Sequence, residues 1–261
     1  MRKIIFILFI VLCLACTKTD NAVTPAIITR TLEGTVYLYD EFGHRQSNSY
    51  NVTVYVNDTT TDNTQAALSS TIPPSNDTTF TDSAGTYIVY DVSIGTYTLT
   101  YSKAGYGIYK HFGFSIAGSA SPQTLPSVSL NEYSTTIPSN LSLTYRGNYS
   151  DDTVKITGDI NIMSIAPAQR HVIIFIDTLN TVSSLSYSYS ISVTVEEGSQ
   201  AFSQNFYPSQ QGISPGTKLY CIAYGQPYGP TNSYADPISG LTVFPGLNSN
   251  PSNMAAIIVT E

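Results

Sequence analysis

Hydrophobic and polar residues alternate along much of the chain from residue 31 onward. The clearest stretch covers residues 187–195, where Tyr, Ile and Val alternate with Ser and Thr. A period of two residues is typical of a β-strand with one buried and one solvated face. Segments with strand-like pattern are 32–39, 50–56, 86–90, 96–101, 109–116, 140–145, 154–163, 171–176, 186–195, 201–207, 219–224 and 255–260. No amphipathic helix pattern follows the N-terminus, so the chain is predicted to be all-β.

The length and the turn signals divide these segments into two units. A chain of 261 residues is long enough for two domains of roughly 100–150 residues each. We predict two consecutive antiparallel β-sandwich domains, over residues 30–130 and 131–261. Residues 57–76 are dominated by Asn, Asp, Thr and Ser, which indicates a long loop with little to bury.

The N-terminus combines a basic start, an apolar run and a small residue before a cysteine: Arg2, Lys3, residues 4–12, Ala15 and Cys16. This order is the plan of an export signal, and the apolar run is too short to span a membrane. A cysteine directly after the small residue makes the segment resemble the lipobox of bacterial lipoproteins. The resemblance implies that a signal peptide of residues 1–15 is removed and that Cys16 receives a diacylglycerol. An ordinary secretory signal is the alternative.

A lipid on Cys16 would anchor the protein to a membrane and so determine its location in the cell. Two or more acyl chains, palmitate among them, anchor a protein stably. Residues 16–29 are predicted to be a flexible tether between the membrane and the first domain. The expected location is the outer membrane of the cell envelope, on its periplasmic or its surface-exposed face. Cleavage also removes Arg2 and Lys3, which changes the formal charge from −7 to −7 − 2 = −9.

Composition narrows the classes of partner. Charged residues make up 11% of the chain, and the formal charge of −7 leaves no basic face for nucleic acid. The chain holds 20 Tyr and 10 Phe but no Trp. Tyr, Thr and Val suit half-buried strands. The expected partners are the membrane and a glycan or protein ligand.

The first domain carries a run of turn and strand residues with a recognisable spacing. The residues are Gly34-x-Val36, Thr81-Asp82-x-x-Gly85-x-Tyr87, Gly95-x-Tyr97-x-Leu99 and Gly105-Tyr106. This run resembles the carboxypeptidase regulatory-like domain, a transthyretin-like β-sandwich of the carbohydrate-binding-like kind. In the turn, Asp82 is expected to accept a backbone hydrogen bond from two residues on, and Gly85 to adopt a positive φ. The resemblance brings no catalytic residue with it.

The second domain has a weaker resemblance of its own. Residues 214–220, Ser-Pro-Gly-Thr-Lys-Leu-Tyr, are similar to the segment that leads into the penultimate strand of fibronectin type III-like domains. Seven short strands separated by turns fit a sandwich of that kind.

Catalytic and metal-binding patterns are not found in the sequence. His44, His111 and His171 have no second His or Cys at metal-ligand spacing, and there is no nucleophile elbow or phosphate loop. Cys221 lies in a strand-like run without a neighbouring base, which predicts a buried, inert thiol. We therefore expect no enzyme activity, no cofactor and no metal.

Calcium is the metal alternative that the loops leave open. Asp58, Asp62 and Asp77 could gather in the long loop, and Asp151 and Asp152 could gather with Asp159. Their spacing does not match an EF-hand, and a solvated loop is the favoured interpretation.

A Gly- and Pro-rich loop near residue 228 is the candidate binding site. Its candidate contact residues are Tyr224, Gln226, Tyr228, Asn232 and Tyr234. Tyrosine offers a rigid apolar ring with a polar tip, the chemistry of many ligand-binding loops. Ordinary loop packing is the alternative.

Asp-Thr pairs followed by a small residue or Thr are similar to the O-glycosylation acceptor pattern of Bacteroidota. Of these, Thr59 and Thr78 lie in or beside the long loop and are the candidate sites.

Taken together, the sequence favours a non-catalytic, membrane-anchored surface lipoprotein that acts as a binding or scaffolding module for a glycan or a protein. One alternative is a fimbrial structural subunit, because such subunits resemble this plan and are cleaved after an Arg; Arg30 stands just before the first strand. Another is an accessory protein of a glycan-degrading system.

Overall fold

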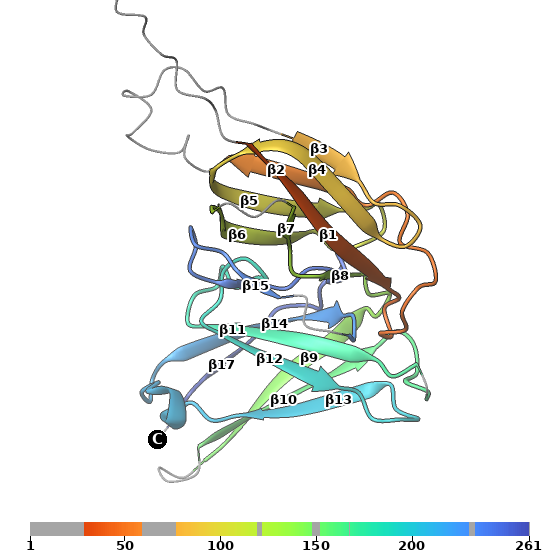
Figure 1. Ribbon diagram of the computed structural model, residues 1–261. Helices are drawn as coiled ribbons and strands as arrows, with labels where there is room; N and C mark the ends of the chain where they lie inside the picture. Colours follow the sequence, from red (N-terminus) through yellow and green to blue (C-terminus); the bar gives the residue numbers. More distant parts are fainter. Residues whose placement is uncertain are drawn as a thin grey trace, which may run out of the picture.

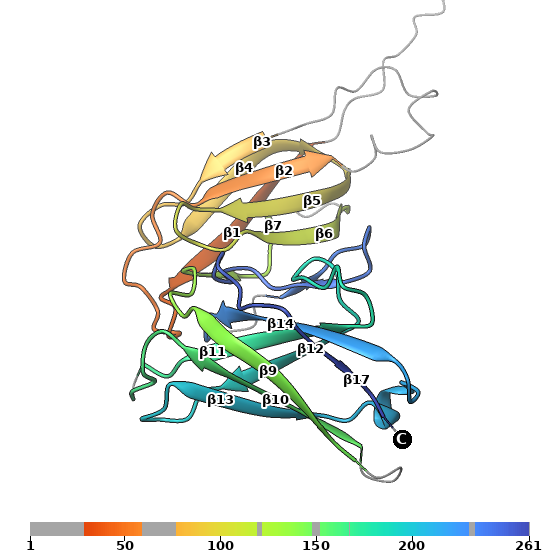
Figure 2. The ribbon, with the colours of Figure 1, turned by 180° about the vertical axis from the view of Figure 1, so that it is seen from behind.

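A computed structural model describes residues 29–58, 77–118, 122–147, 152–166, 168–229 and 233–260. These residues form strands and one 3₁₀ turn, η2 (Ser209–Gln211), so the predicted all-β class is confirmed. Figures 1 and 2 show two β units, one built from β1–β8 and one from the strands that follow. The predicted signal peptide, Cys16 and nearly all of the tether lie outside the described residues. No helix in the described part of the chain is long and apolar enough to cross a membrane.

The first unit consists of two facing sheets. One sheet has the order β4-β1-β7 with β8 also on β1: β4 (Thr86–Ser93), β1 (Thr29–Tyr39), β7 (Gln123–Thr124) and β8 (Val128–Asn131). The other has the order β3-β2-β5-β6: β3 (Asp77–Phe80), β2 (Thr53–Asp58), β5 (Gly95–Ser102) and β6 (Tyr109–Ile116). β7 and β8 pair with β1 in parallel, unlike the antiparallel pairing predicted throughout. The chain crosses from β6 back to the free edge of β1, and a crossover connection permits parallel pairing.

The alternation seen in the sequence is what builds the first core. Leu32, Val36 and Leu38 of β1 point inward and are at most 1% exposed. Between the sheets, the hydroxyls of Tyr87 and Tyr101 lie 2.9 Å apart, and burial raises the pKa of Tyr87 to about 12. The turn that leads into β4 contains Gly85 at φ +87°. Asp82 closes this turn by accepting the backbone N–H of Thr86 at 2.8 Å, four residues on rather than two as expected.

The second unit is a sandwich of three and four strands, all antiparallel. One sheet has the order β13-β10-β9: β13 (Ala201–Phe206), β10 (Thr153–Ile160) and β9 (Pro138–Arg146). The other has the order β12-β11-β14-β17: β12 (Tyr189–Thr194), β11 (His171–Asp177), β14 (Lys218–Gln226) and β17 (Ala255–Ile258). Each strand segment predicted between residues 140 and 260 falls on one of these strands.

β11 is buried on both of its faces. Val172, Ile174 and Ile176 belong to the main core between the two sheets. Ile173 and Phe175 point the other way, into a second apolar cluster. The chain between β14 and β17 covers this outer face and contains the short strands β15 (Tyr234–Ala235) and β16 (Thr242–Val243). Figure 1 shows β15 between the first unit and the β11–β14 sheet, so this segment is also the layer where the two units meet.

Candidate functional site

A largely buried ion pair joins the two units. Arg170, just before β11, places its Nη1 3.0 Å from Oε1 of Glu41, and both side chains are 11% exposed. Thr135, in the segment between the units, donates its N–H to Glu41 Oε2 at 2.7 Å and its hydroxyl to Oε1 at 2.6 Å. The guanidinium of Arg170 also lies 4.7 Å from the centre of the Phe42 ring. A buried charge is tolerated when it is paired and hydrogen-bonded in this way.

The turn that presents Glu41 is itself fixed. Asp40 Oδ1 accepts the backbone N–H groups of Phe42 at 2.9 Å and His44 at 2.8 Å. Its Oδ2 lies 2.9 Å from Nδ1 of His44. Burial raises the pKa of the Asp40 carboxyl, but the hydrogen bonds from His44 and Phe42 outweigh it and hold the pKa below the ordinary value. Gly43 completes the turn at φ +83°, a conformation that favours glycine.

The predicted binding loop packs into this junction. The ring of Tyr228 stacks on His171 with centres 4.7 Å apart and an interplanar angle of 15°. Its N–H donates to the Glu41 carbonyl at 2.8 Å, and its carbonyl accepts from Asn131 Nδ2 at 2.7 Å. Tyr234 lies against two rings of β6, at centre distances of 5.5 Å from Tyr109 and 6.0 Å from Phe112.

The remaining loop candidates are placed differently. Tyr224 packs edge-on against Phe175 in the second apolar cluster, at 5.6 Å. Gln226 ends β14, and its Oε1 is buried without a hydrogen-bond partner among the described residues. Asn232 lies outside the described residues. The candidates do not form one exposed surface, and a ligand-binding role for them stays a prediction.

The junction also contains buried polar side-chain atoms that have no hydrogen-bond partner in the described part of the chain. Asn131 Oδ1 and Arg170 Nε are, like Gln226 Oε1, buried and unpartnered in the described part of the chain. Ordered water commonly satisfies such atoms. Sequence reasoning missed this junction, because Glu41 and Arg170 are 129 residues apart and neither belongs to a motif.

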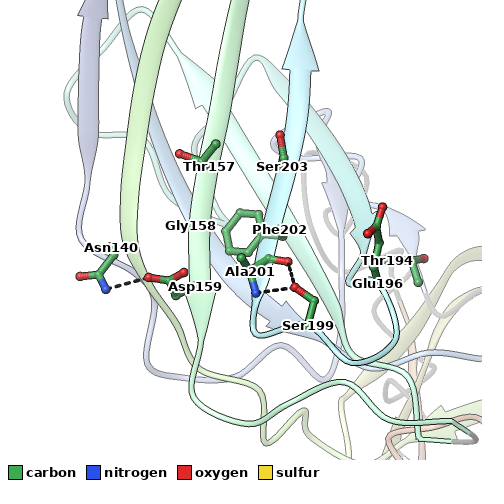
Figure 3. Close-up of a pocket in the computed structure, with 10 residues that line it drawn as sticks. All are labelled: Asn140, Thr157, Gly158, Asp159, Thr194, Glu196, Ser199, Ala201, Phe202 and Ser203. Atoms are coloured by element: carbon green, nitrogen blue, oxygen red, sulfur yellow. Dashed lines mark hydrogen bonds between the residues drawn. The ribbon is translucent and has the colours of Figure 1, made fainter.

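A polar pocket of about 440 Å³ opens on the second unit, beside the β13-β10-β9 sheet. Figure 3 shows Asn140 and Asp159 on one side and Glu196 on the other, with Phe202 between them. Asn140 Nδ2 donates to Asp159 Oδ2 at 2.9 Å. Two carboxylates and several hydroxyls give the pocket an acidic, polar lining. Across the described residues, no group of three His, Cys, Asp or Glu side chains is placed to hold a metal.

A second hollow, of about 660 Å³, lies between β12 and β13. We call it the tyrosine groove, and its lining comprises Tyr187, Ser188, Tyr189, Ser190, Ile191, Gln204, Asn205, Phe206, Tyr207, Gln211, Gly240, Leu241 and Thr242. The hydroxyl of Tyr187 donates to the Thr242 carbonyl at 2.7 Å, and that of Tyr189 donates to the Gln211 carbonyl at 3.2 Å. The described lining residues are all uncharged. The sequence predicted the strands on both sides of this groove, over 186–195 and 201–207, but not the groove itself.

The residues considered for catalysis are accounted for by packing. Cys221 is buried in the second core, and burial raises its thiol pKa to about 12. Burial also lowers the pKa of His171, whose Nδ1 lies 3.2 Å from the Thr194 hydroxyl. Asp152 accepts hydrogen bonds from the backbone N–H and the hydroxyl of Ser209, and thereby fixes the start of η2.

The candidate modification and processing sites divide between described and undescribed parts of the chain. Thr78 is exposed on β3, whereas Thr59 lies outside the described residues, as do Asp62 and Asp151. Arg30 is part of β1, where it pairs with Val92 of β4. Its Nε donates to the Gly118 carbonyl at 3.0 Å. Cleavage after Arg30 in the folded protein would therefore have to open a paired strand.

Comparison with known proteins yields distant structural similarity. No protein-family profile matches the chain, and no curated protein matches it. A proposed carbohydrate-binding protein from Bacteroides uniformis is 11% identical, with 88% of this chain and 99% of that chain covered and a TM-score of 0.32. A DUF3823 family protein from the same species is 12% identical, with 89% and 100% covered and a TM-score of 0.29. Another from Parabacteroides merdae is 15% identical, with 87% and 98% covered and a TM-score of 0.29. Similarity at this level assigns neither a family nor a function.

Proposed function

We propose that the chain is a non-catalytic, membrane-anchored surface lipoprotein whose two β-sandwiches act as one rigid binding or scaffolding module. Its anchor is the lipidated Cys16, and its place is the outer membrane of the cell envelope. A glycan is the ligand class that we favour, and a protein partner is the alternative.

The junction between the units is the observation that carries this proposal. The β1–β2 turn, the segment after β8 and the β14–β15 segment all meet there, through Glu41, Thr135 and Tyr228. A flexible linker between independent domains would not need a buried ion pair and stacked rings. A rigid joint instead keeps the distal unit at a fixed orientation relative to the first, which suits the presentation of a ligand or a partner.

The ionisable groups support a non-catalytic role. A nucleophilic cysteine needs a low pKa and access to solvent, whereas burial gives Cys221 a raised pKa. His171 is stacked on Tyr228 and bonded to Thr194. Neither side chain is placed as a nucleophile with its base.

Rigidity is testable by pulsed electron paramagnetic resonance. Spin labels on Tyr90→Cys in β4 and Leu185→Cys in the second unit occupy side chains that are 65% and 74% exposed. In a chain with Cys13→Ser and Cys16→Ser, the remaining native cysteine is the buried Cys221, which stays unlabelled. We expect one narrow distance distribution, which Arg170→Ala broadens. A broad distribution in the parent protein would contradict a rigid module.

Lipidation is tested separately by metabolic labelling with palmitate. Cys16→Ser should abolish the label, and Cys13→Ser, at a cysteine within the signal peptide of residues 1–15, should leave it unchanged. Unaltered labelling of Cys16→Ser would refute the anchor.

A further inference from the structure

We infer that the tyrosine groove binds a neutral oligosaccharide. This inference rests on the proposed function and extends it, because it names the site and the class of ligand. The site differs from the loop that the sequence singled out, which packs against the first unit.

The groove has the position and the size of a binding site. β12 and β13 each stand at the edge of their sheet, so the groove follows the open side of the sandwich. Its volume of about 660 Å³ lies within the usual range of small-molecule sites, roughly 300–1,000 Å³. It opens to solvent rather than being enclosed, so a ligand can enter it from outside.

The charge of the lining selects the ligand. None of the described residues that line the groove carries a charge, whereas the pocket of Figure 3 contains Asp159 and Glu196. A charged ligand in the groove would lose part of its hydration and gain no ionic partner, which is unfavourable. An uncharged, hydroxylated ligand avoids that loss.

The aromatic rings of the groove are held in place before any ligand arrives. The hydroxyls of Tyr187 and Tyr189 are tied to backbone carbonyls on two different segments. The Tyr187 ring also packs against Phe175 with centres 4.7 Å apart, and the Tyr189 ring packs against Phe206 at 5.4 Å. Fixed rings lose little conformational freedom on binding and offer apolar surface to the C–H faces of a sugar.

Amide side chains supply the polar half of sugar recognition. Asn205 and Gln211 are exposed at the groove, and Tyr207 is 40% exposed. An amide can both donate and accept a hydrogen bond, which matches a sugar hydroxyl that does the same. Rings and amides without a charge are therefore the combination expected for a neutral glycan.

Isothermal titration calorimetry on the purified full chain tests the inference. The probes are cellohexaose, maltohexaose, mannohexaose and xylohexaose, with hexagalacturonate as the charged comparison. We expect at least one neutral hexasaccharide to bind and hexagalacturonate not to bind. Tyr207→Ala and the double variant Asn205→Ala/Gln211→Ala should each weaken binding about tenfold or more. Asp159→Asn in the Figure 3 pocket is the matched control and should leave affinity unchanged.

The outcomes separate this inference from the proposed function. Binding that Asp159→Asn abolishes and the groove variants do not would overturn the inference and keep the binding module. Binding of hexagalacturonate but of no neutral hexasaccharide would overturn the neutral class. No binding of any probe would also overturn the inference, while the spin-label distances decide the rigid module independently.

Discussion

The junction and the tyrosine groove both contain Tyr, Phe and amide side chains, but the junction also contains the charged pair of Glu41 and Arg170. At the junction, the rings contact other rings of the chain: Tyr228, although 57% exposed, stacks on His171, and Tyr234 lies against Tyr109 and Phe112. In the groove, Tyr207 and Asn205 face solvent. The difference teaches that a Tyr- and amide-rich loop can pack against other parts of the same chain. Its composition alone therefore does not identify a ligand-binding site.

The largest expected effect comes from breaking the ion pair of the junction. Arg170→Ala leaves the largely buried Glu41 carboxylate without its counter-charge, and loss of one partner of a fully buried pair sets the upper limit of the cost, about 3–5 kcal/mol. Chemical denaturation should show this loss in the free energy of unfolding. Arg146→Ala, at an exposed arginine of β9, is the matched control and should change it by no more than about 0.5 kcal/mol. Equal effects for the two variants would mean that the ion pair contributes nothing to stability.

A smaller effect is expected from the aromatic contacts. Tyr234→Ala removes the ring that touches Tyr109 and Phe112, and each such pair is worth about 0.5–1.5 kcal/mol beyond its buried area. The free energy of unfolding should fall by about 1–3 kcal/mol. Tyr90→Ala, on an exposed face of β4, serves as the comparison and should be nearly neutral. A neutral Tyr234→Ala would show that the loop is not bound to the first unit.

Acidification should lower the stability of the folded protein by a smaller amount than these substitutions do, through protonation of His171 at the junction. Burial lowers the pKa of His171 below its ordinary value of 6.5, so the neutral ring is favoured in the folded protein. As the pH falls through 6.5, the unfolded chain takes up the proton first, and stability present at neutral pH is lost. Thermal unfolding between pH 7.5 and 5.5 measures this slope. His171→Phe keeps a ring against Tyr228 and should reduce the slope; an unchanged slope would assign it to other groups.

The smallest effect on folding is expected in the groove. Asn205→Ala and Gln211→Ala replace exposed side chains, so the free energy of unfolding should change by no more than an ordinary surface substitution does, about 0.5 kcal/mol in either direction. Loss of stability in either variant would mean that the groove, like the junction, is part of the packing.

The strands were predictable because their pattern is local. The predicted segment 171–176 falls within β11, and 201–207 covers β13 with one residue more. The alternation of buried and exposed positions, as in β10, requires only neighbouring residues and one buried face. The strand order β13-β10-β9 and β12-β11-β14-β17 is compatible with the fibronectin type III-like resemblance, which stays a prediction.

The junction was not predictable because its partners are distant in sequence. No sequence pattern near Glu41 predicts its contact with Arg170, and none near Tyr234 predicts its contact with Tyr109. β11 likewise reads as a single apolar run, and its second buried face exists because the chain after β14 covers it. The parallel pairing of β7 and β8 with β1 also depends on a crossover that no local pattern specifies.

Chemical-shift mapping tests the contrast between junction and groove most directly. The ¹⁵N-labelled full chain would be titrated with the neutral hexasaccharide that binds best. We predict that shifts concentrate in residues 187–191, 204–211 and 240–242, and that Tyr224, Tyr228 and Tyr234 stay unshifted. Shifts at these tyrosines without shifts along β12 and β13 would contradict the account, because the junction loop would then be the ligand site.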